Sequence, residues 1–144
     1  MKRFSTVLLI LAISLLAAGN IFSQESKASY YTITTWKIQV PEDGSRKEFL
    51  DMMKEWHTKV TLKNSKILSE RSLLHQSGND MRDFVLITEY ASWNDIEAAS
   101  EEQGKLVEAG WPDKEKRKAF FDRFWQYAKT HSDEIFRDDP ALRK

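Results

Sequence analysis

The chain of 144 residues lacks cysteine altogether and contains only three prolines and five glycines. Without cysteine, disulfides, thiolate metal sites and thiol-linked lipid anchors are excluded, so the fold must be held together by packing alone. The three histidines show no His-x-x-x-His or His-x-His spacing, which leaves the usual zinc patterns unmet. We therefore expect no metal site and a domain that depends on its hydrophobic core.

Only one long hydrophobic run is present, and it lies at the start of the chain. Lys2 and Arg3 precede the run Val7–Ala18, and polar residues begin at Ser23. A short basic start followed by an apolar stretch of this length is typical of a cleaved secretory signal, whereas a membrane span needs roughly 20 apolar residues. We expect residues 1–23 to be removed and the protein to be exported, periplasmic or extracellular, without stable membrane insertion.

A large excess of either charge sign is also lacking. Of the 22 basic side chains, Lys2 and Arg3 would leave with the signal, so 20 would remain against 22 acidic ones. This slightly negative balance argues against nucleic acid, which needs a clustered positive surface. The length allows one domain, which we place at 30–137, between a flexible start at 24–29 and a tail at 138–144.

The hydrophobic pattern alternates between strand and helix periods. Ser45 with Glu48, and Ser92 with Asp95, have the spacing of capping boxes, which cap the starts of helices. This order predicts an α+β, ferredoxin-like split unit with one extra helix; the last segment is either a short edge strand or a final helical turn. The expected elements are a strand over 30–40, a helix from 45 to about 63, a hairpin of strands over 67–76 and 84–91, helices over 92–110 and 112–128, and the segment 132–137.

The third strand is apolar on both faces. Phe84, Leu86 and Tyr90 point one way, and Val85 and Ile87 point the other way. Strands lose their polar alternation when both faces are covered, and helices of one chain cover one face of a ferredoxin-like sheet. We expect the second face to pair with another copy in a homodimer; the alternative is a monomer in which the extra helix covers it.

The end of the third strand resembles a known superfamily. Glu89 and Tyr90 close the strand, and Ser92 and Trp93 open a helix, within the segment Ile87–Ala98. In this manner the chain is similar to the dimeric α+β-barrel superfamily, which includes antibiotic-biosynthesis-type monooxygenases and stress-responsive domains. The resemblance implies a dimeric α+β barrel.

Two departures bear on the activity that the resemblance implies. Many members of the superfamily carry a histidine about ten residues into the second helix, where this chain has Glu102, Gln103 and Gly104. The helix that follows Pro112 is an addition. The resemblance therefore implies the fold more directly than a monooxygenase activity.

His57 borders the apolar stripe of the first helix, four residues after Met53. A neutral imidazole there could act as a base, or as an axial ligand if haem were bound. The alternative is a half-exposed histidine beside the core.

Arg71 and His75 share one face of the second strand with Leu73. Together they could receive an anionic ligand through charge-assisted hydrogen bonds, with Glu89 on the neighbouring strand as a counter-charge. The alternative is a cross-strand pair of Arg71 with Glu89 and no ligand.

Aromatic residues are abundant, at 12% of the chain. They could line an apolar ligand cavity, or they could be ordinary core, in which Phe124 and Trp125 would anchor the last long helix. The candidates for the cavity are Trp56, Trp93, Trp111, Trp125, Phe120, Phe121 and Phe124.

His131, Ser132 and Asp133 form a contiguous triplet that contains the residue types of a hydrolytic triad. Contiguous residues cannot adopt triad geometry, and no Gly-x-Ser-x-Gly elbow is present. A turn or a cap is the better interpretation.

The leading hypothesis is an exported dimer that binds a small apolar or aromatic molecule between helices and sheet, without an identifiable catalytic signature. A second is a cofactor-independent monooxygenase or a haem-handling enzyme, with His57 or His75 as base or ligand. A third is a structural module that assembles through its sheet and binds no ligand.

Overall fold

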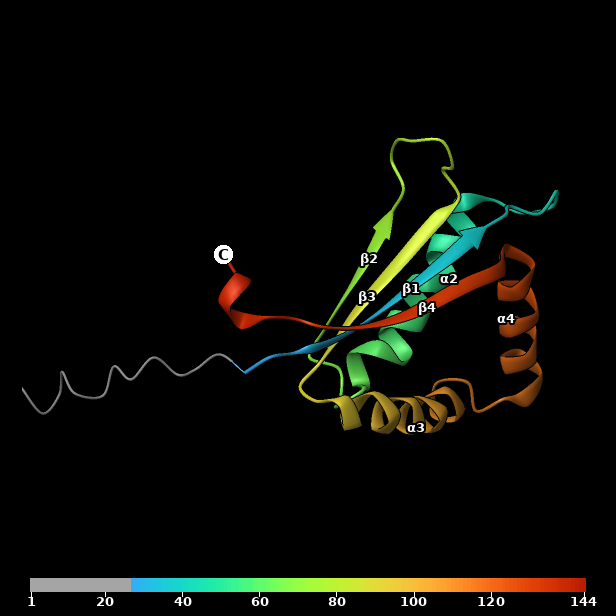
Figure 1. Ribbon diagram of the computed structural model, residues 1–144. Coiled ribbons are helices and arrows are strands. Elements are labelled where there is room, and N and C mark those ends of the chain that lie inside the picture. Colours follow the sequence, from blue (N-terminus) through green and yellow to red (C-terminus); the bar gives the residue numbers. More distant parts are fainter. Residues whose placement is uncertain (1–26) are drawn as a thin grey trace, which may run out of the picture.

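The computed structural model describes residues 27–144 (Figure 1). The predicted signal peptide at 1–23 lies outside these residues. Within residues 27–144, no helix combines the length and the hydrophobicity that crossing a membrane requires. The elements are β1 (Tyr30–Ile38), α2 (Arg46–Lys59), the 3₁₀ turn η1 (Thr61–Lys63), β2 (Ser69–Leu74), β3 (Asp83–Tyr90), α3 (Trp93–Gly110), α4 (Lys114–Tyr127), β4 (Ala128–Arg137) and the 3₁₀ turn η2 (Pro140–Leu142).

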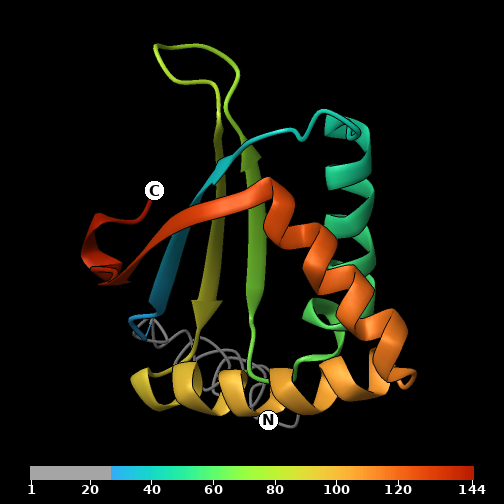
Figure 2. The same cartoon turned by 90° about the vertical axis from the view of Figure 1, so that its right-hand side faces the viewer.

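The four strands form one sheet in the order β2-β3-β1-β4, and each neighbouring pair is antiparallel. Figure 2 shows α2 and α4 on one face of this sheet, with α3 across its lower end. The strand order is that of a ferredoxin-like split unit. The predicted α+β fold class and the predicted β2–β3 hairpin are therefore confirmed.

The last segment is a full strand. β4 runs for ten residues and pairs with β1 from Ala128 to Arg137. It is therefore a strand and not a helical turn, and it is longer than the expected segment 132–137. Nine of its ten residues are exposed, because β4 lies at the sheet edge, and its sequence therefore lacks a clear alternation. The preceding helix begins at Lys114, with Asp113 rather than Pro112 at its start.

Both predicted caps are present. The Ser45 hydroxyl accepts the backbone N–H of Glu48 at 3.1 Å, and the Ser92 hydroxyl accepts that of Asp95 at 3.3 Å. The Glu48 side chain does not complete a capping box, because the Ser45 N–H donates to the Tyr127 hydroxyl at 2.9 Å instead. That hydroxyl in turn donates to Glu48 at 2.6 Å, which fastens the start of α2 to the end of α4.

Arg123 strengthens the same junction by donating to both oxygens of Glu48, at 2.6 and 2.9 Å. Arg123 and then Tyr127 lower the pKa of the Glu48 carboxyl to about 2. Gly44 is required beside this junction, because any side chain there would collide with the Tyr127 ring. Helix α4, the extra element, is thus fixed against α2.

The core lies between the sheet and α2 and α4. Phe49 and Tyr127 are 1% and 0% exposed, and the Phe49 ring meets the edge of Phe84 at 5.2 Å between centroids. Phe124 packs against this cluster, as predicted. Trp125 is 49% exposed, so the expectation that it is a core anchor was wrong: it follows Phe124 directly and therefore projects from a different side of α4.

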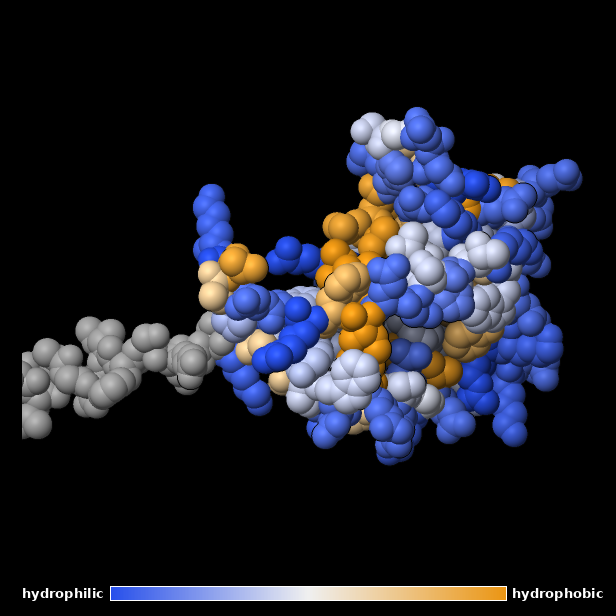
Figure 3. Space-filling view, viewed as in Figure 1, coloured by the Kyte–Doolittle hydropathy of each residue, from blue (hydrophilic) through white to orange (hydrophobic). Residues whose placement is uncertain are grey.

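Among residues 27–144, no helix lies on the other face of the sheet, and we call it the open face. Leu73 and Phe136 are 47% and 46% exposed, and a band of hydrophobic residues crosses this side of the molecule (Figure 3). The alternative in which the extra helix covers this face is wrong. Phe120 and Phe124 of α4 pack against the same core as Phe49, and that core lies on the opposite face of the sheet. By strand register the apolar residues of the open face are Tyr31, Ile33, Leu73, Val85, Ile87 and Phe136.

The described parts of the two expected loose ends contact each other. The Ser29 N–H donates to Asp138 at 2.6 Å, and Arg143 pairs with Asp138 and donates to the Lys27 carbonyl at 3.2 Å. These contacts hold the start of β1 beside the turn that follows β4.

Candidate functional site

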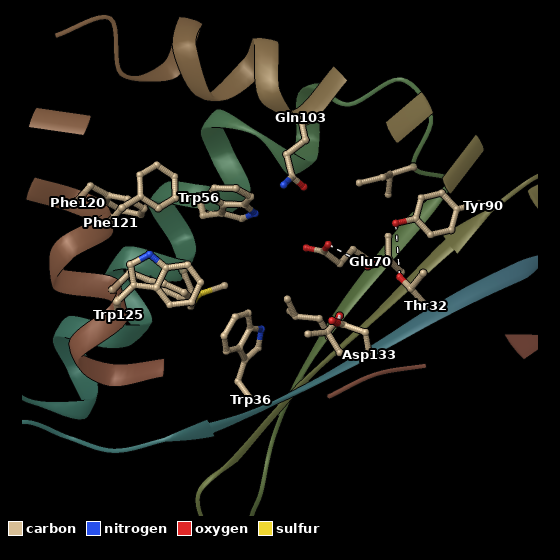
Figure 4. A pocket seen from close by; sticks show the side chains of 16 residues that line it. Thr32, Trp36, Trp56, Glu70, Tyr90, Gln103, Phe120, Phe121, Trp125 and Asp133 are labelled. Atoms are coloured by element: carbon tan, nitrogen blue, oxygen red, sulfur yellow. Dashed lines mark hydrogen bonds between the residues drawn. The ribbon is translucent and has the colours of Figure 1, made fainter. Parts of the chain in front are cut away.

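A pocket of about 330 Å³ lies between the helix-covered face of the sheet and the helices α2, α3 and α4 (Figure 4). Its volume is at the lower end of the range of small-molecule sites. Strand parity explains its sheet side, because alternate residues of β1 and β3 point toward the helices. The lining residues are Thr32, Thr34, Trp36, Met53, Trp56, Ile67, Glu70, Leu86, Thr88, Tyr90, Gln103, Phe120, Phe121, Phe124, Trp125 and Asp133.

Aromatic rings form one side of this pocket. Trp36 of β1 meets Phe124 and Trp125 of α4 at 5.4 and 5.6 Å between ring centroids. Trp56 of α2 meets Phe121 edge to face at 6.1 Å. These rings come from three separate elements, so the aromatic side exists only in the folded chain.

Glu70 of β2 is the central polar group. Its carboxylate accepts the hydroxyls of Thr61 at 3.1 Å and Thr88 at 3.2 Å, and its side chain is only 10% exposed. Figure 4 shows the carboxylate pointing into the space between Trp56 and Tyr90. A carboxylate oxygen is thereby presented to any ligand that enters.

Tyr90 and Gln103 supply neutral polar groups on the side away from α4. The Tyr90 hydroxyl lies 3.5 Å from that of Thr32. Burial raises the pKa of the Tyr90 phenol, and the charge of Glu70 raises it further, so the phenol keeps its proton at neutral pH. Gln103 reaches toward the pocket from α3 (Figure 4).

Asp133 of β4 brings a second carboxylate. It accepts the Thr34 hydroxyl at 2.7 Å and lies 3.0 Å from Nε2 of His131. The His131 ring contacts that of Trp36 at 4.1 Å between centroids, tilted by 32°. Ser132 points to the opposite face of the sheet, since strand residues alternate. The three contiguous residues therefore do not assemble a triad, as predicted, but they lie in a strand rather than in a turn or cap.

The lining that residues 27–144 provide contains acidic side chains and no lysine or arginine. The acidic side chains are the ionisable carboxylates of Glu70 and Asp133. Within residues 27–144, no lysine or arginine nitrogen lies within 4.0 Å of either carboxylate. The same part of the chain contains no group of three or more histidine, aspartate or glutamate side chains that could hold a metal ion.

The aromatic candidates divide into two groups. Five of them line the pocket: Trp56, Trp125, Phe120, Phe121 and Phe124. Trp111 is 5% exposed and lies behind it, where its indole N–H donates to Glu55 at 3.0 Å. Trp93 is 58% exposed and is therefore a surface residue.

The ionisable candidates lie outside the pocket. Arg71 and Glu89 are on the open face, opposite Ile87 and Ser69 respectively. Glu89 accepts the Ser69 hydroxyl at 2.7 Å, and no ion pair joins it to Arg71 within residues 27–144. The structure therefore lacks the cross-strand pair of Arg71 with Glu89 that was the alternative, and it places Arg71 and Glu89 outside the pocket.

The two candidate histidines are also separate from the lining. Nδ1 of His75 lies 3.4 Å from Asp83, beyond the end of β2. Nδ1 of His57 lies 3.9 Å from Glu70, and its side chain is 46% exposed. His57 thus borders the pocket through Glu70, as the half-exposed alternative proposed.

Sequence reasoning missed Glu70, Thr88 and Asp133. Thr88 has the same parity as Phe84 and could have been placed on the helix-covered face from the alternation alone. Glu70 needed the hairpin register, which pairs it with Thr88. Asp133 needed the last segment to be recognised as a strand.

The fold is shared with solved structures of low sequence identity. SnoaB, a cofactor-independent oxygenase from Streptomyces nogalater, was solved as a variant; it is 9% identical, has a TM-score of 0.53, and the match covers 81% of this chain and 98% of that one. A NIPSNAP family protein from Agrobacterium tumefaciens is 15% identical with a TM-score of 0.51, and the match covers 75% of this chain and 90% of that one. A dimeric ferredoxin-like protein from an uncultured marine organism is 8% identical with a TM-score of 0.50, and the match covers 81% of this chain and 92% of that one.

These similarities confirm the predicted resemblance at the level of the fold. No protein-family model and no curated protein matches the chain. The fold is therefore that of the ferredoxin-like dimeric α+β proteins, while the activity has to be argued from the site.

Proposed function

We propose that this protein is an exported homodimer that binds a small, largely aromatic molecule in the pocket between its sheet and helices. The observation that carries the proposal is the pocket itself, in which rings from three elements face the buried carboxylate of Glu70. Ligand sites combine an apolar lining with a few polar groups that orient the ligand, and this pocket has that composition.

Binding is favoured over catalysis by the position of the histidines. The oxygenase and haem alternatives required His57 or His75 as base or axial ligand, and neither lines the pocket. The likeness to SnoaB is a likeness of fold alone at 9% identity. Binding therefore needs only groups that the pocket contains.

We expect Trp125→Ala to weaken binding of an aromatic ligand about tenfold, because stacked aromatic contacts contribute about 0.5–1.5 kcal/mol beyond the buried area. Trp93→Ala is the matched control, since Trp93 is similarly exposed but lies outside the pocket. A thermal-shift screen of lipids, aromatic compounds and haem would identify the ligand, because a ligand at 100 times Kd adds about 2.7 kcal/mol of stability. The absence of any shift across such a set would refute the proposal.

The homodimer is supported by the open face and by a neighbour. Soluble monomers rarely expose a contiguous apolar patch larger than a few hundred Å², and here apolar residues from all four strands share one bare face. The ferredoxin-like protein from the marine organism is described as dimeric. A two-fold contact of sheet against sheet would cover both copies at once.

We expect the exported protein to begin at or near Gln24. Cleavage after Ser23 follows the apolar core by the distance expected of a secretory signal. Intact mass spectrometry of protein recovered from the periplasm or medium measures the start directly. Retention of Val7–Ala18 in that protein would contradict both the cleavage and the export.

A further inference from the structure

We infer that the pocket selects an organic cation, an aromatic or alkyl ammonium compound, over neutral and anionic molecules of the same shape. This inference rests on the proposed binding function and adds the chemical class of the ligand. It follows from three features of the lining: a buried carboxylate without a cationic partner, aromatic rings around it, and a second carboxylate.

The Glu70 carboxylate is the first feature. Its side chain is 90% buried, since only 10% is exposed, and its hydrogen-bond donors are the neutral hydroxyls of Thr61 and Thr88. Among residues 27–144, the one ionisable nitrogen within 4.0 Å of it is Nδ1 of His57, at 3.9 Å, on a side chain that is 46% exposed to water. A buried charge is costly unless it is paired, so a cation in the pocket would supply the missing partner.

The aromatic side is the second feature. The faces of indole and phenyl rings carry negative potential and attract cations within about 6 Å, tryptophan most strongly. Trp36, Trp56 and Trp125 all line the pocket, and Figure 4 shows the Glu70 carboxylate between them and Tyr90. An ammonium group could therefore contact a carboxylate and ring faces together.

The third feature is the charge of the remaining lining. Asp133 adds a second carboxylate, bonded to the Thr34 hydroxyl and close to His131. No lysine or arginine of residues 27–144 lines the pocket, so an anionic ligand would meet two carboxylates and no basic side chain of this part of the chain. The pocket therefore selects a cation both by attracting it and by repelling anions.

Three probes of nearly equal shape test the charge preference: benzyltrimethylammonium, its uncharged carbon analogue neopentylbenzene, and benzylsulfonate. Binding to the full exported protein is measured by quenching of tryptophan fluorescence and by calorimetry. We expect the cation to bind about tenfold or more tightly than the neutral analogue, as cation–π contacts and a desolvated ion pair predict, and the anion to bind at least tenfold more weakly than the neutral analogue.

Glu70→Gln should remove most of the preference for the cation and leave the affinity for neopentylbenzene within about twofold. The control Glu97→Gln removes the same charge from an exposed position on α3 and should change neither affinity. Thermal unfolding of each variant shows whether it is folded. Asp133→Asn is a second test of the charge preference, because it removes the second carboxylate and leaves the buried hydrogen bonds of Glu70 intact.

The outcomes separate this inference from the function on which it rests. If neopentylbenzene binds as tightly as the cation, the pocket binds small molecules but the charge preference is wrong. If Glu97→Gln weakens cation binding as much as Glu70→Gln, the preference arises from net charge and not from the pocket, which also overturns the inference. If none of the probes binds and the broader ligand screen is also blank, the binding function fails with it.

Discussion

Replacing Phe49 with alanine is expected to lower the free energy of unfolding by about 3–5 kcal/mol, the usual cost of truncating a fully buried phenylalanine. Phe49 is 1% exposed, and its ring lies 5.2 Å from that of Phe84, 5.8 Å from that of Tyr127 and 6.3 Å from that of Phe124. The substitution would leave a cavity where α2, α4 and β3 meet. With a total stability of typically about 5–15 kcal/mol, a large share would be lost.

Denaturant unfolding of wild type and variant at one protein concentration measures this effect, since the stability of a dimer depends on concentration. Trp93→Ala is the control, because its side chain is larger but 58% exposed and should cost less than about 1 kcal/mol. A loss of less than about 1 kcal/mol for Phe49→Ala would show that the core is not centred on this residue, by the same range.

The features that the sequence predicted correctly depend on neighbours in the chain. A cap requires a hydroxyl and a backbone N–H three residues apart, as for Ser45 and Glu48, and both lie within one helical turn. The two apolar faces of β3 follow from the alternation of side chains along a single strand. Local spacing was therefore enough to predict most of the helices and strands, and to predict that Val85 and Ile87 share one face of β3.

The features that the sequence could not predict depend on which strands pair and in which register. Arg71 and Glu89 appeared beside a ligand site because their face of the sheet could not be assigned, and that face is the open one. Glu70 and Asp133 reach the pocket from strands that lie on opposite edges of the sheet. Their proximity to one cavity is a property of tertiary structure, with no signal in the spacing along the chain.

The position of Ile87 makes it the most informative residue for the proposed dimer. It lies on β3, one of the two central strands, and pairs with Ile33 on one side and Arg71 on the other. Aspartate at position 87 would therefore face the Arg71 guanidinium across the hairpin, a favourable cross-strand pair in a single copy exposed to water. The folded monomer should tolerate the change.

We expect Ile87→Asp to raise the dissociation constant of the dimer at least about 100-fold, because both copies would bury a carboxylate in an apolar contact. Such burial costs several kcal/mol even beside a cation, and about 1.4 kcal/mol corresponds to a factor of ten. Leu62→Asp is the control, since it adds the same charge at a residue of η1 that is 69% exposed and lies away from the open face. Sedimentation velocity at micromolar concentration should show a dimer for wild type and Leu62→Asp, and a folded monomer for Ile87→Asp. A wild-type protein that sediments as a monomer would contradict the dimer. An Ile87→Asp variant that remains dimeric would show that the dimer contact is not on the open face.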